Sequence, residues 1–336
     1  MLGADPPVDR VALTLGVHDY DHVRDLLSGE VPVEGVRLTP LRFSVEEIFF
    51  RFPRHREWHV SELSLAKYVT MRGGGDDSLA AIPVFTSRSF RHSALFVRPD
   101  GPVDDPSALA GGRIGIPEWT QTATVWARGL LRDEYGIDLA GIEWVQAGTN
   151  EPGRREGIPV SPPEQITIRP EPERTLNEML VAGELDAIVC AHPPTHFTDG
   201  SGRIVRLFSD HRNVEADYYR RTGVFPIMHV VAMRADVHER QPWVAMNLMT
   251  AFEEAKRRSM GRALDVNAPR FPVPWAPANA EAAVAAFGED FWPYGIDPNL
   301  PTLRTFLGYA HDQGLTPRRL EPEELFVPQV RERFRI

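Results

Sequence analysis

The chain has 336 residues, and 42% of them are hydrophobic, so it is long enough to bury a core and to form two domains or lobes. A formal net charge of -10 and a pI near 5.6 argue against nucleic acid as a partner. The single cysteine, Cys190, excludes an internal disulfide and a thiolate metal cluster.

The first part of the chain alternates strands with helices. After a short Pro-containing tail at residues 1–9, strands are predicted at Val11–Val17, Val36–Leu41 and Trp58–Leu63, and helices at Asp21–Ser28, Val45–Arg56 and Leu65–Met71. Gly29 ends the first helix, and Gly73–Gly75 ends the third. Such alternation is typical of a parallel sheet that is covered by helices.

The pattern starts again at Gly111–Pro117, which reads as a turn followed by a short strand. Further strands are predicted at Ile142–Val145, Leu185–Cys190 and Gly223–Met233, and helices at Thr120–Tyr135, Thr175–Val181, Pro242–Arg258, Ala278–Phe287 and Leu300–Gln313. Residues 148–172 are rich in proline and polar side chains, and we expect them to be irregular.

One α/β unit that is interrupted by a second predicts an α/β fold of two lobes. We expect Arg91–Arg98 to be the outward crossing strand and Phe225–Arg234 the returning one. Residues 1–95 with 227–336 would then form the first lobe, and residues 96–226 the second. Ligands of such folds bind in the cleft, at carboxyl ends of strands and N-termini of helices.

The segment Ser87–Ser93 carries two guanidinium groups and an imidazole within five residues, at Arg88, Arg91 and His92. Arginine binds a carboxylate through two parallel hydrogen bonds, and histidine can transfer protons near neutral pH. A turn must intervene for Arg88 and Arg91 to converge, because alternation along an extended chain puts them on opposite faces. The segment therefore suits an anionic small molecule; a solvated basic loop is the alternative.

Several segments spread over nearly the whole chain carry a family resemblance together. They are Glu46–Arg51, Ser61–Leu65, Ala81–Phe85, Ser87–Ser93, Gly115–Trp119, Glu151–Arg154, Tyr218–His229 and Asp290–Gly295. On these residues the chain resembles the 4,5-dihydroxyphthalate decarboxylase family, relatives of type II periplasmic binding proteins. The resemblance implies a two-lobed type II periplasmic-binding-protein-like fold and decarboxylation of a hydroxylated aromatic carboxylate.

The implied substrate defines the chemistry, since each hydroxyl group lies para to one carboxylate. Removal of a phenolic proton pushes electron density onto the ring carbon that bears the departing carboxylate. An acid then protonates that carbon, and carbon dioxide leaves from a non-aromatic intermediate. The site needs a clamp for the retained carboxylate, a base, a proton donor and dry surroundings, and no metal or organic cofactor is strictly required.

Four residues are candidates for proton transfer. His92 is the first, with a structural histidine as its alternative. Glu62 ends a predicted strand before the helix that opens at Ser64, and it could orient a histidine or accept a phenolic proton. His229 lies on the return strand, where a satisfied core histidine is the alternative. Glu118 lies at the mirror position of Glu62 in the second lobe.

The predicted carboxylate clamp is formed by Arg88 and Arg91, backed by the Ser64 hydroxyl. The other candidate substrate-binding residues are Thr120, Thr122, His18, His192, Tyr218 and Tyr219. Thr120 has helix capping as its alternative, and the two tyrosines have core packing.

No metal or organic cofactor is expected. Histidines recur at four-residue spacing in His18/His22, His55/His59 and His192/His196, but each pair spans an element junction or a Pro-Pro pair, so none has the geometry of a helical zinc site. Only Lys67 and Lys256 could form a Schiff base, and both have helical, polar-flanked settings, which argues against pyridoxal phosphate.

The expected partner is a small aromatic carboxylate. The first twenty residues lack a signal-peptide pattern and no segment approaches a membrane span, so we expect a cytoplasmic protein that needs no membrane. The oligomeric state stays open, with the Trp- and Pro-rich C-terminal third as a candidate interface between copies. A non-catalytic carboxylate-binding protein and another enzyme on the same scaffold are the alternative functions.

Overall fold

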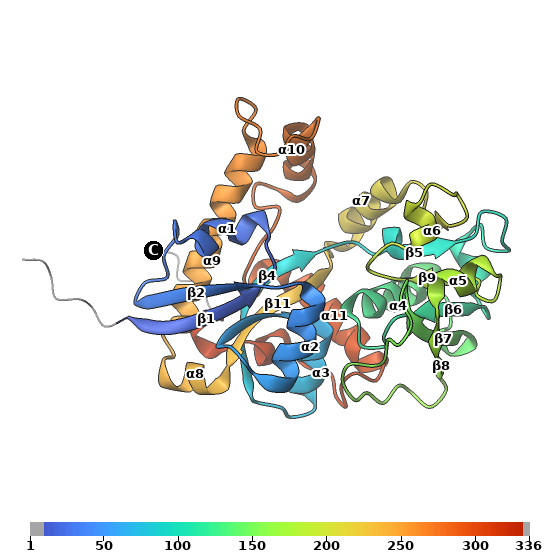
Figure 1. Cartoon of the computed structure of the whole chain (residues 1–336), viewed down its shortest axis with the longest axis horizontal. Coiled ribbons are helices and arrows are strands. Elements are labelled where there is room, and N and C mark those ends of the chain that lie inside the picture. The colour runs from blue at the N-terminus through green and yellow to red at the C-terminus, as the bar shows by residue number, and fades with distance from the viewer. Residues whose placement is uncertain (1–9, 332–336) are drawn as a thin grey trace, which may run out of the picture.

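The computed structural model describes residues 10–331, whose elements form two bodies that lie side by side (Figure 1). The predicted tail at residues 1–9 lies outside the described residues. One sheet has five strands in the order β2-β1-β3-β11-β4, and the other has six in the order β10-β5-β9-β6-β7-β8. We call the body around the five-stranded sheet the first lobe and the other the second lobe.

The first lobe begins with the predicted alternation. Its opening elements are β1 (Val11–Val17), α1 (Asp21–Ser28), β2 (Val36–Arg42), α2 (Val45–His55), β3 (Val60–Ser64) and α3 (Leu65–Gly73). β1 pairs in parallel with β2 and β3, as the alternation predicts. Gly29 ends α1 with a φ of 84°, a left-handed conformation that favours glycine.

Two further strands complete this sheet. β11 (Ile227–Arg234) lies antiparallel between β3 and β4 (Leu79–Arg88). β4 was not predicted, because Pro83 interrupts its apolar run and proline is rare inside a sheet. The register between β11 and β4 shifts beside this proline, between the pairs formed by His229 and Val231.

The second lobe contains the elements from β5 to α7. They are β5 (Leu95–Val97), β6 (Arg113–Ile116), α4 (Thr122–Tyr135), β7 (Glu143–Gly148), β8 (Thr167–Thr175), α5 (Leu176–Val181), β9 (Ala187–Val189), α6 (Thr195–Thr198), β10 (Val205–Arg206) and α7 (His211–Thr222). β8 lies where an irregular segment was predicted. It is an edge strand, and an edge tolerates the prolines that hid it.

The chain crosses between the lobes in two non-strand segments, which corrects the prediction of two crossing strands. Ser89 to Arg91 leads into a 3-10 turn at His92–Ala94, and only then does β5 begin. The return through Gly223 to Pro226 is also irregular, and β11 lies wholly in the first sheet. The backbone N–H of Ser89 donates to the carbonyl oxygen of Pro226 over 3.1 Å, so the two crossings lie side by side.

Four helices follow β11, namely α8 (Ala235–Arg240), α9 (Val244–Leu264), α10 (Ala276–Phe287) and α11 (Leu300–Asp312). α11 reaches the second lobe, where Nε of Arg128 in α4 donates to Oε1 of Gln313 over 2.8 Å. Nε2 of Gln313 donates in turn to the carbonyl oxygen of Val125 over 3.0 Å. The domain boundaries at residues 95/96 and 226/227 stay a prediction.

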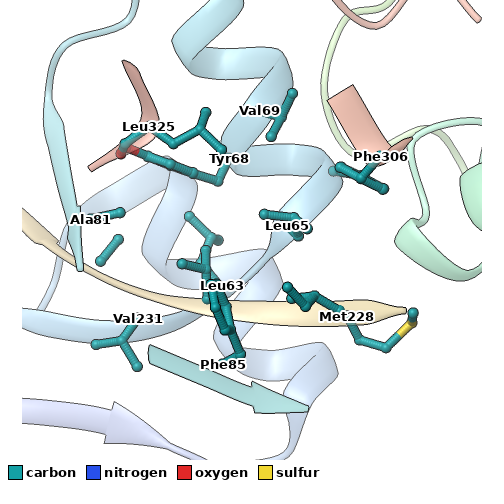
Figure 2. Packing of buried hydrophobic residues seen from close by; sticks show 14 of the residues in the cluster. Leu63, Leu65, Tyr68, Val69, Ala81, Phe85, Met228, Val231, Phe306 and Leu325 are labelled. Atoms are coloured by element: carbon teal, nitrogen blue, oxygen red, sulfur yellow. The ribbon is translucent and has the colours of Figure 1, made fainter. Parts of the chain in front are cut away.

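Buried side chains fix the β3–α3 turn against β11. Figure 2 shows Leu63, Leu65, Phe85 of β4 and Val231 of β11 among the buried hydrophobic side chains of this lobe, and none of the four has exposed surface. Burial of an aliphatic or aromatic side chain of this size stabilises the fold by about 1.5–3 kcal/mol. In the register between β3 and β11, Val231 lies opposite Glu62. This register brings the polar residues of the two strands close together.

Candidate functional site

A buried carboxylate lies at the centre of the polar residues in the first lobe. Glu62 of β3 accepts hydrogen bonds from Nδ1 of His229 at 2.6 Å and from the Tyr20 hydroxyl at 2.7 Å. The Thr86 hydroxyl donates over 3.0 Å, and the backbone N–H of His18 donates to the other oxygen, also over 3.0 Å. Three segments that are distant in sequence therefore converge on one side chain.

These donors keep Glu62 ionised in a site that excludes water. Burial opposes the charge, but the hydrogen bond from His229 and its electrostatic attraction, with the donors from His18 and Tyr20, hold the pKa of Glu62 below its usual value. Burial, followed by the charge of Glu62, raises the pKa of Tyr20, so its hydroxyl stays protonated and remains a donor.

His229 presents its second ring nitrogen away from this network. An ionised carboxylate only accepts hydrogen bonds, so Nδ1 carries the proton and Nε2 is the free atom. Within residues 10–331 no protein atom hydrogen-bonds to Nε2, and 16% of the side chain is exposed. The edge of the Phe49 ring lies against the imidazole, with the ring centroids 4.7 Å apart. This arrangement can hold and transfer a proton at Nε2.

Two helix N-termini meet where the lobes touch. Ser64 caps α3 by accepting from the backbone N–H of Lys67, and its hydroxyl lies 2.9 Å from the Thr122 hydroxyl at the start of α4. The Thr122 hydroxyl also accepts from the backbone N–H of Ala66 over 3.1 Å. Helix N-termini favour anions, so these two expected substrate-binding residues occupy a position suited to a carboxylate.

Glu118 is buried in the second lobe between two cations. Nε of Arg154 donates to it over 2.6 Å, and Nζ of Lys67 from the first lobe lies 3.2 Å away. Thr120 does not cap α4. Its backbone N–H and hydroxyl donate to Glu156, whose pKa is raised by burial. In this structure Glu118 and Thr120 contact protein partners that would have to separate before either could contact a substrate.

The two arginines of the predicted clamp do not converge. The Arg88 guanidinium donates to the carbonyl oxygens of Phe225 at 3.0 Å and Pro293 at 2.7 Å and to the Asn299 side chain. These protein acceptors hold it in the first lobe. Arg91 donates from Nε to the Met228 sulfur over 3.2 Å, and among the described residues no acceptor meets its terminal nitrogens.

Both arginines stay charged at neutral pH, although burial lowers the pKa of Arg88 to about 9 and that of Arg91 to about 10. The turn at His92–Ala94 follows Arg91 and directs the chain into the second lobe. Arg91 alone therefore keeps guanidinium N–H groups available for a carboxylate.

The structure places His92 in an aromatic pocket of the second lobe. Its ring lies edge-on to Phe208 and Tyr218, its Nδ1 is buried without a described partner, and burial lowers its pKa to about 4. Tyr219 packs against Phe287, with ring centroids 4.4 Å apart. Among residues 10–331, no hydrogen bond or ring contact of these predicted residues joins them to the Glu62 network.

The remaining two histidines lie at the edges of the lobes. Nδ1 of His18 is 3.1 Å from the carbonyl oxygen of Phe43, and its side chain is exposed. His192 follows β9 in the second lobe, and its Nε2 is 2.7 Å from Oε1 of Glu46 on α2. This contact joins the two lobes.

Between residues 10 and 331 no group of three or more His, Cys, Asp or Glu side chains is arranged to hold a metal ion. A cavity of about 490 Å³ opens in the second lobe against Trp119, Glu156 and Ile158. Its lining includes no member of the Glu62 network. The proposed site is therefore identified by its hydrogen-bonded titratable groups and not by the volume of a cavity.

None of the helices in residues 10–331 has the length and apolar character that crossing a membrane requires.

The fold has two α/β lobes joined by paired crossings, and its polar groups lie at strand ends and helix N-termini. These features define the two-lobed binding-protein class. Solved structures similar to the chain include the sulfonate-binding protein SsuA from Methylobacillus flagellatus KT (12% identity, 96% of this chain and 93% of that chain, TM-score 0.55). Another is the ligand-binding component of an ABC-type import system from Staphylococcus aureus (11%, 96% and 98%, TM-score 0.53). A third is the desulfurization enzyme DSZB (14%, 96% and 97%, TM-score 0.51). These similarities confirm the predicted type II fold.

Two curated relatives are much more similar in sequence. The 4,5-dihydroxyphthalate decarboxylase of Comamonas testosteroni is 37% identical over 330 residues, which are 98% of this chain and 100% of the relative. That of Pseudomonas putida is 36% identical over 214 residues, or 63% of this chain and 83% of the relative. A comparison with protein-family models finds no match. The chain belongs to the 4,5-dihydroxyphthalate decarboxylase family and is a carboxy-lyase.

Sequence reasoning singled out Glu62 and His229, and the structure brings these two together. It missed Tyr20, Thr86 and Glu46, which contact predicted site residues. Tyr20 lies two residues after His18 at the carboxyl end of β1, so its position at a strand end was an available signal. Thr86 lies in β4, the strand that was not predicted, and no local pattern pointed to it.

Proposed function

We propose that this protein decarboxylates 4,5-dihydroxyphthalate, or a closely related hydroxylated aromatic carboxylate, with His229 and Glu62 as its proton-transfer pair. The observation that carries the proposal is the buried Glu62 carboxylate bonded to Nδ1 of a histidine whose Nε2 is free. The substrate is supported by the names of two relatives in the same family.

In this proposal Nε2 of His229 takes the proton from one phenolic hydroxyl, and Glu62 stabilises the resulting imidazolium charge. Electron density moves to the ring carbon para to that oxygen, and this carbon accepts a proton that is taken up from solvent. The carbon–carboxylate bond then breaks, carbon dioxide leaves, and the bonding electrons restore the aromatic ring as a phenolate, to which His229 returns its proton. The organic product is 3,4-dihydroxybenzoate.

Arg91 is the proposed partner of the retained carboxylate, because its terminal nitrogens have no described acceptor. Ser64 and Thr122 would add hydroxyl groups and the positive ends of two helices. The phenolate itself supplies the electron density that carbon protonation needs, so the proposed reaction requires no organic cofactor as an electron sink.

The test is incubation of the purified protein with 4,5-dihydroxyphthalate and with a panel of hydroxylated benzoates, while carbon dioxide release and 3,4-dihydroxybenzoate are measured. We expect His229→Gln to lower kcat by a factor of about 10²–10⁴, the usual contribution of a general acid–base group. His238→Gln on α8 is the matched control, since the His238 ring lies 3.1 Å from the Gln329 side chain and, within the described residues, forms no hydrogen bond to the Glu62 network. Full activity of His229→Gln, or no carbon dioxide from any compound, would refute the proposal.

A further inference from the structure

An exposed ion pair joins the lobes close to the proposed site. Nε2 of His192, on the loop after β9, lies 2.7 Å from Oε1 of Glu46, in the first turn of α2. The two side chains retain 69% and 47% of their exposure, so the contact lies at the rim where the lobes meet. In this structure the ring of His192, a predicted substrate ligand, is therefore bonded to a protein carboxylate.

The same helix carries the aromatic ring that contacts the proposed catalytic histidine. Phe49 follows Glu46 by three residues, which places the two side chains on one side of α2. Phe49 packs edge-on against the imidazole of His229. A force that draws Glu46 toward the second lobe therefore also holds Phe49 where it limits the freedom of that ring.

We propose that Glu46 and His192 are positioning residues, whose ion pair holds α2 against the second lobe and thereby seats Phe49 on the imidazole of His229. Their role in catalysis rests on the proposed function, whereas their role in holding the lobes together does not. Neither side chain is assigned a contact with the reacting atoms.

The charged groups around this pair determine its pH dependence. Glu46 raises the pKa of His192 above its ordinary value of 6.5, and His192 lowers the pKa of Glu46 to about 2. The other nearby charges are the guanidinium groups of Arg154 and Arg91. The ion pair is therefore complete between pH 4.5 and pH 6.5. It is lost as the pH rises through the raised pKa of His192, and also as the pH falls through the lowered pKa of Glu46.

The distance between the lobes can be measured without any catalytic activity. The only native cysteine, Cys190, is buried and its pKa is raised to about 12 by burial, so Glu30→Cys with Arg203→Cys offers two exposed labelling positions, one on each lobe. Pulsed electron paramagnetic resonance on the doubly spin-labelled full chain reports the distribution of distances between the two labels. We call molecules with the lobes in contact, as in this structure, closed, and molecules with the lobes farther apart open. We expect the closed fraction of the otherwise native chain to fall as the pH is raised past the His192 transition.

Glu46→Gln and His192→Asn should each lower the ratio of closed to open molecules below that transition by about two- to five-fold, the shift that an exposed ion pair of ordinary strength supports. Both should also remove the pH dependence. The matched control is Asp199→Asn, which breaks a pair of the same length, His196 with Asp199 at 2.7 Å, inside the second lobe.

The kinetic arm separates the two proposals. If the decarboxylase proposal holds, Glu46→Gln and His192→Asn should raise KM by about two- to five-fold and flatten the alkaline side of the pH profile, whereas Asp199→Asn should do neither. If no decarboxylation is found, the distance measurement still tests the ion pair. Distance distributions that are the same in the native chain, Glu46→Gln and Asp199→Asn would overturn the inference.

Discussion

Glu62 shows how a carboxylate can remain charged without any exposed surface. It has three side-chain donors and one backbone donor, and each hydrogen bond to an ionised group is worth about 1.5–3 kcal/mol. Together they replace the water that burial removes. Because the side chain also has no exposed surface, substrate does not reach the carboxylate directly, so at the residue scale Glu62 acts through His229.

The lowered pKa of Glu62 makes stability depend on pH. Since the pKa in the folded chain lies below the ordinary 4.5, the stabilisation is full above pH 4.5 and is lost as the pH falls through the lower value. We expect Glu62→Gln to have a lower urea midpoint than the native chain at neutral pH, and the gap to narrow below pH 4.5. Exposed Glu239→Gln is the control. A gap that stays constant from neutral to acid pH would contradict the assignment.

The neighbouring arginines should respond differently to the same substitution. Arg88→Met leaves buried carbonyl oxygens of Phe225 and Pro293 without donors, so we expect a loss of about 2–4 kcal/mol of stability. Arg91→Met loses only the contact with Met228 and should unfold near the native temperature, but with a KM raised by tenfold or more if the clamp assignment holds. Thermal unfolding and steady-state kinetics on both variants decide between the roles. Equal effects on stability would refute the distinction.

At this scale the sequence predicted part of the site. Glu62 and His229 were accessible to reasoning because each lies on a strand that was predicted. The separation of Arg88 from Arg91 was not accessible in the same way, since nearness in sequence says nothing about which acceptors a buried guanidinium meets. The acceptors of Arg88 come from residues more than a hundred positions away.

At the scale of elements, proline explains why β4 and β8 were missed. Pro83 in β4 and Pro170 in β8 interrupt patterns that otherwise read as extended. β8 tolerates its proline at the edge of its sheet, and β4 tolerates its own where the register with β11 shifts. Helices were predicted more closely, because caps such as Ser64 and Gly29 signal their ends locally.

Two helical glycines provide a matched test of how closely α11 packs on α4. A Cβ added to Gly129 would lie 2.2 Å from the Tyr309 ring, whereas one added to Gly261 of α9 would meet nothing within 4 Å. We expect Gly129→Ala to destabilise the chain by about 1–3 kcal/mol through overpacking. Gly261→Ala should stabilise it by about 0.5–1 kcal/mol, because alanine favours a helix. Urea unfolding of both variants is the measurement, and a neutral Gly129→Ala would show that the contact relaxes at no cost.

For the whole molecule, local patterns predicted two α/β lobes with two crossings between them. They did not predict where the later strands and helices pack. Alternation of strands and helices is a local property and is visible in sequence. The insertion of β11 between β3 and β4, and the position of α11 on α4, depend on contacts between distant residues. Such contacts leave no periodic signal, so only the structure reveals that the C-terminal helices serve both lobes.

The contact between Gln313 and α4 limits how this fold can be recombined. Arg128 also donates to the carbonyl oxygen of Trp119, and the Trp119 indole N–H donates to the carbonyl oxygen of Gln313, so the end of α11 and the start of α4 form one polar unit. A chimera that takes residues 96–226 from one relative and the remainder from another would combine the start of α4 from one protein with the end of α11 from the other. The contacting side chains of this polar unit would then come from two different sequences. Segments exchanged to alter substrate preference should therefore include α11 together with the second lobe.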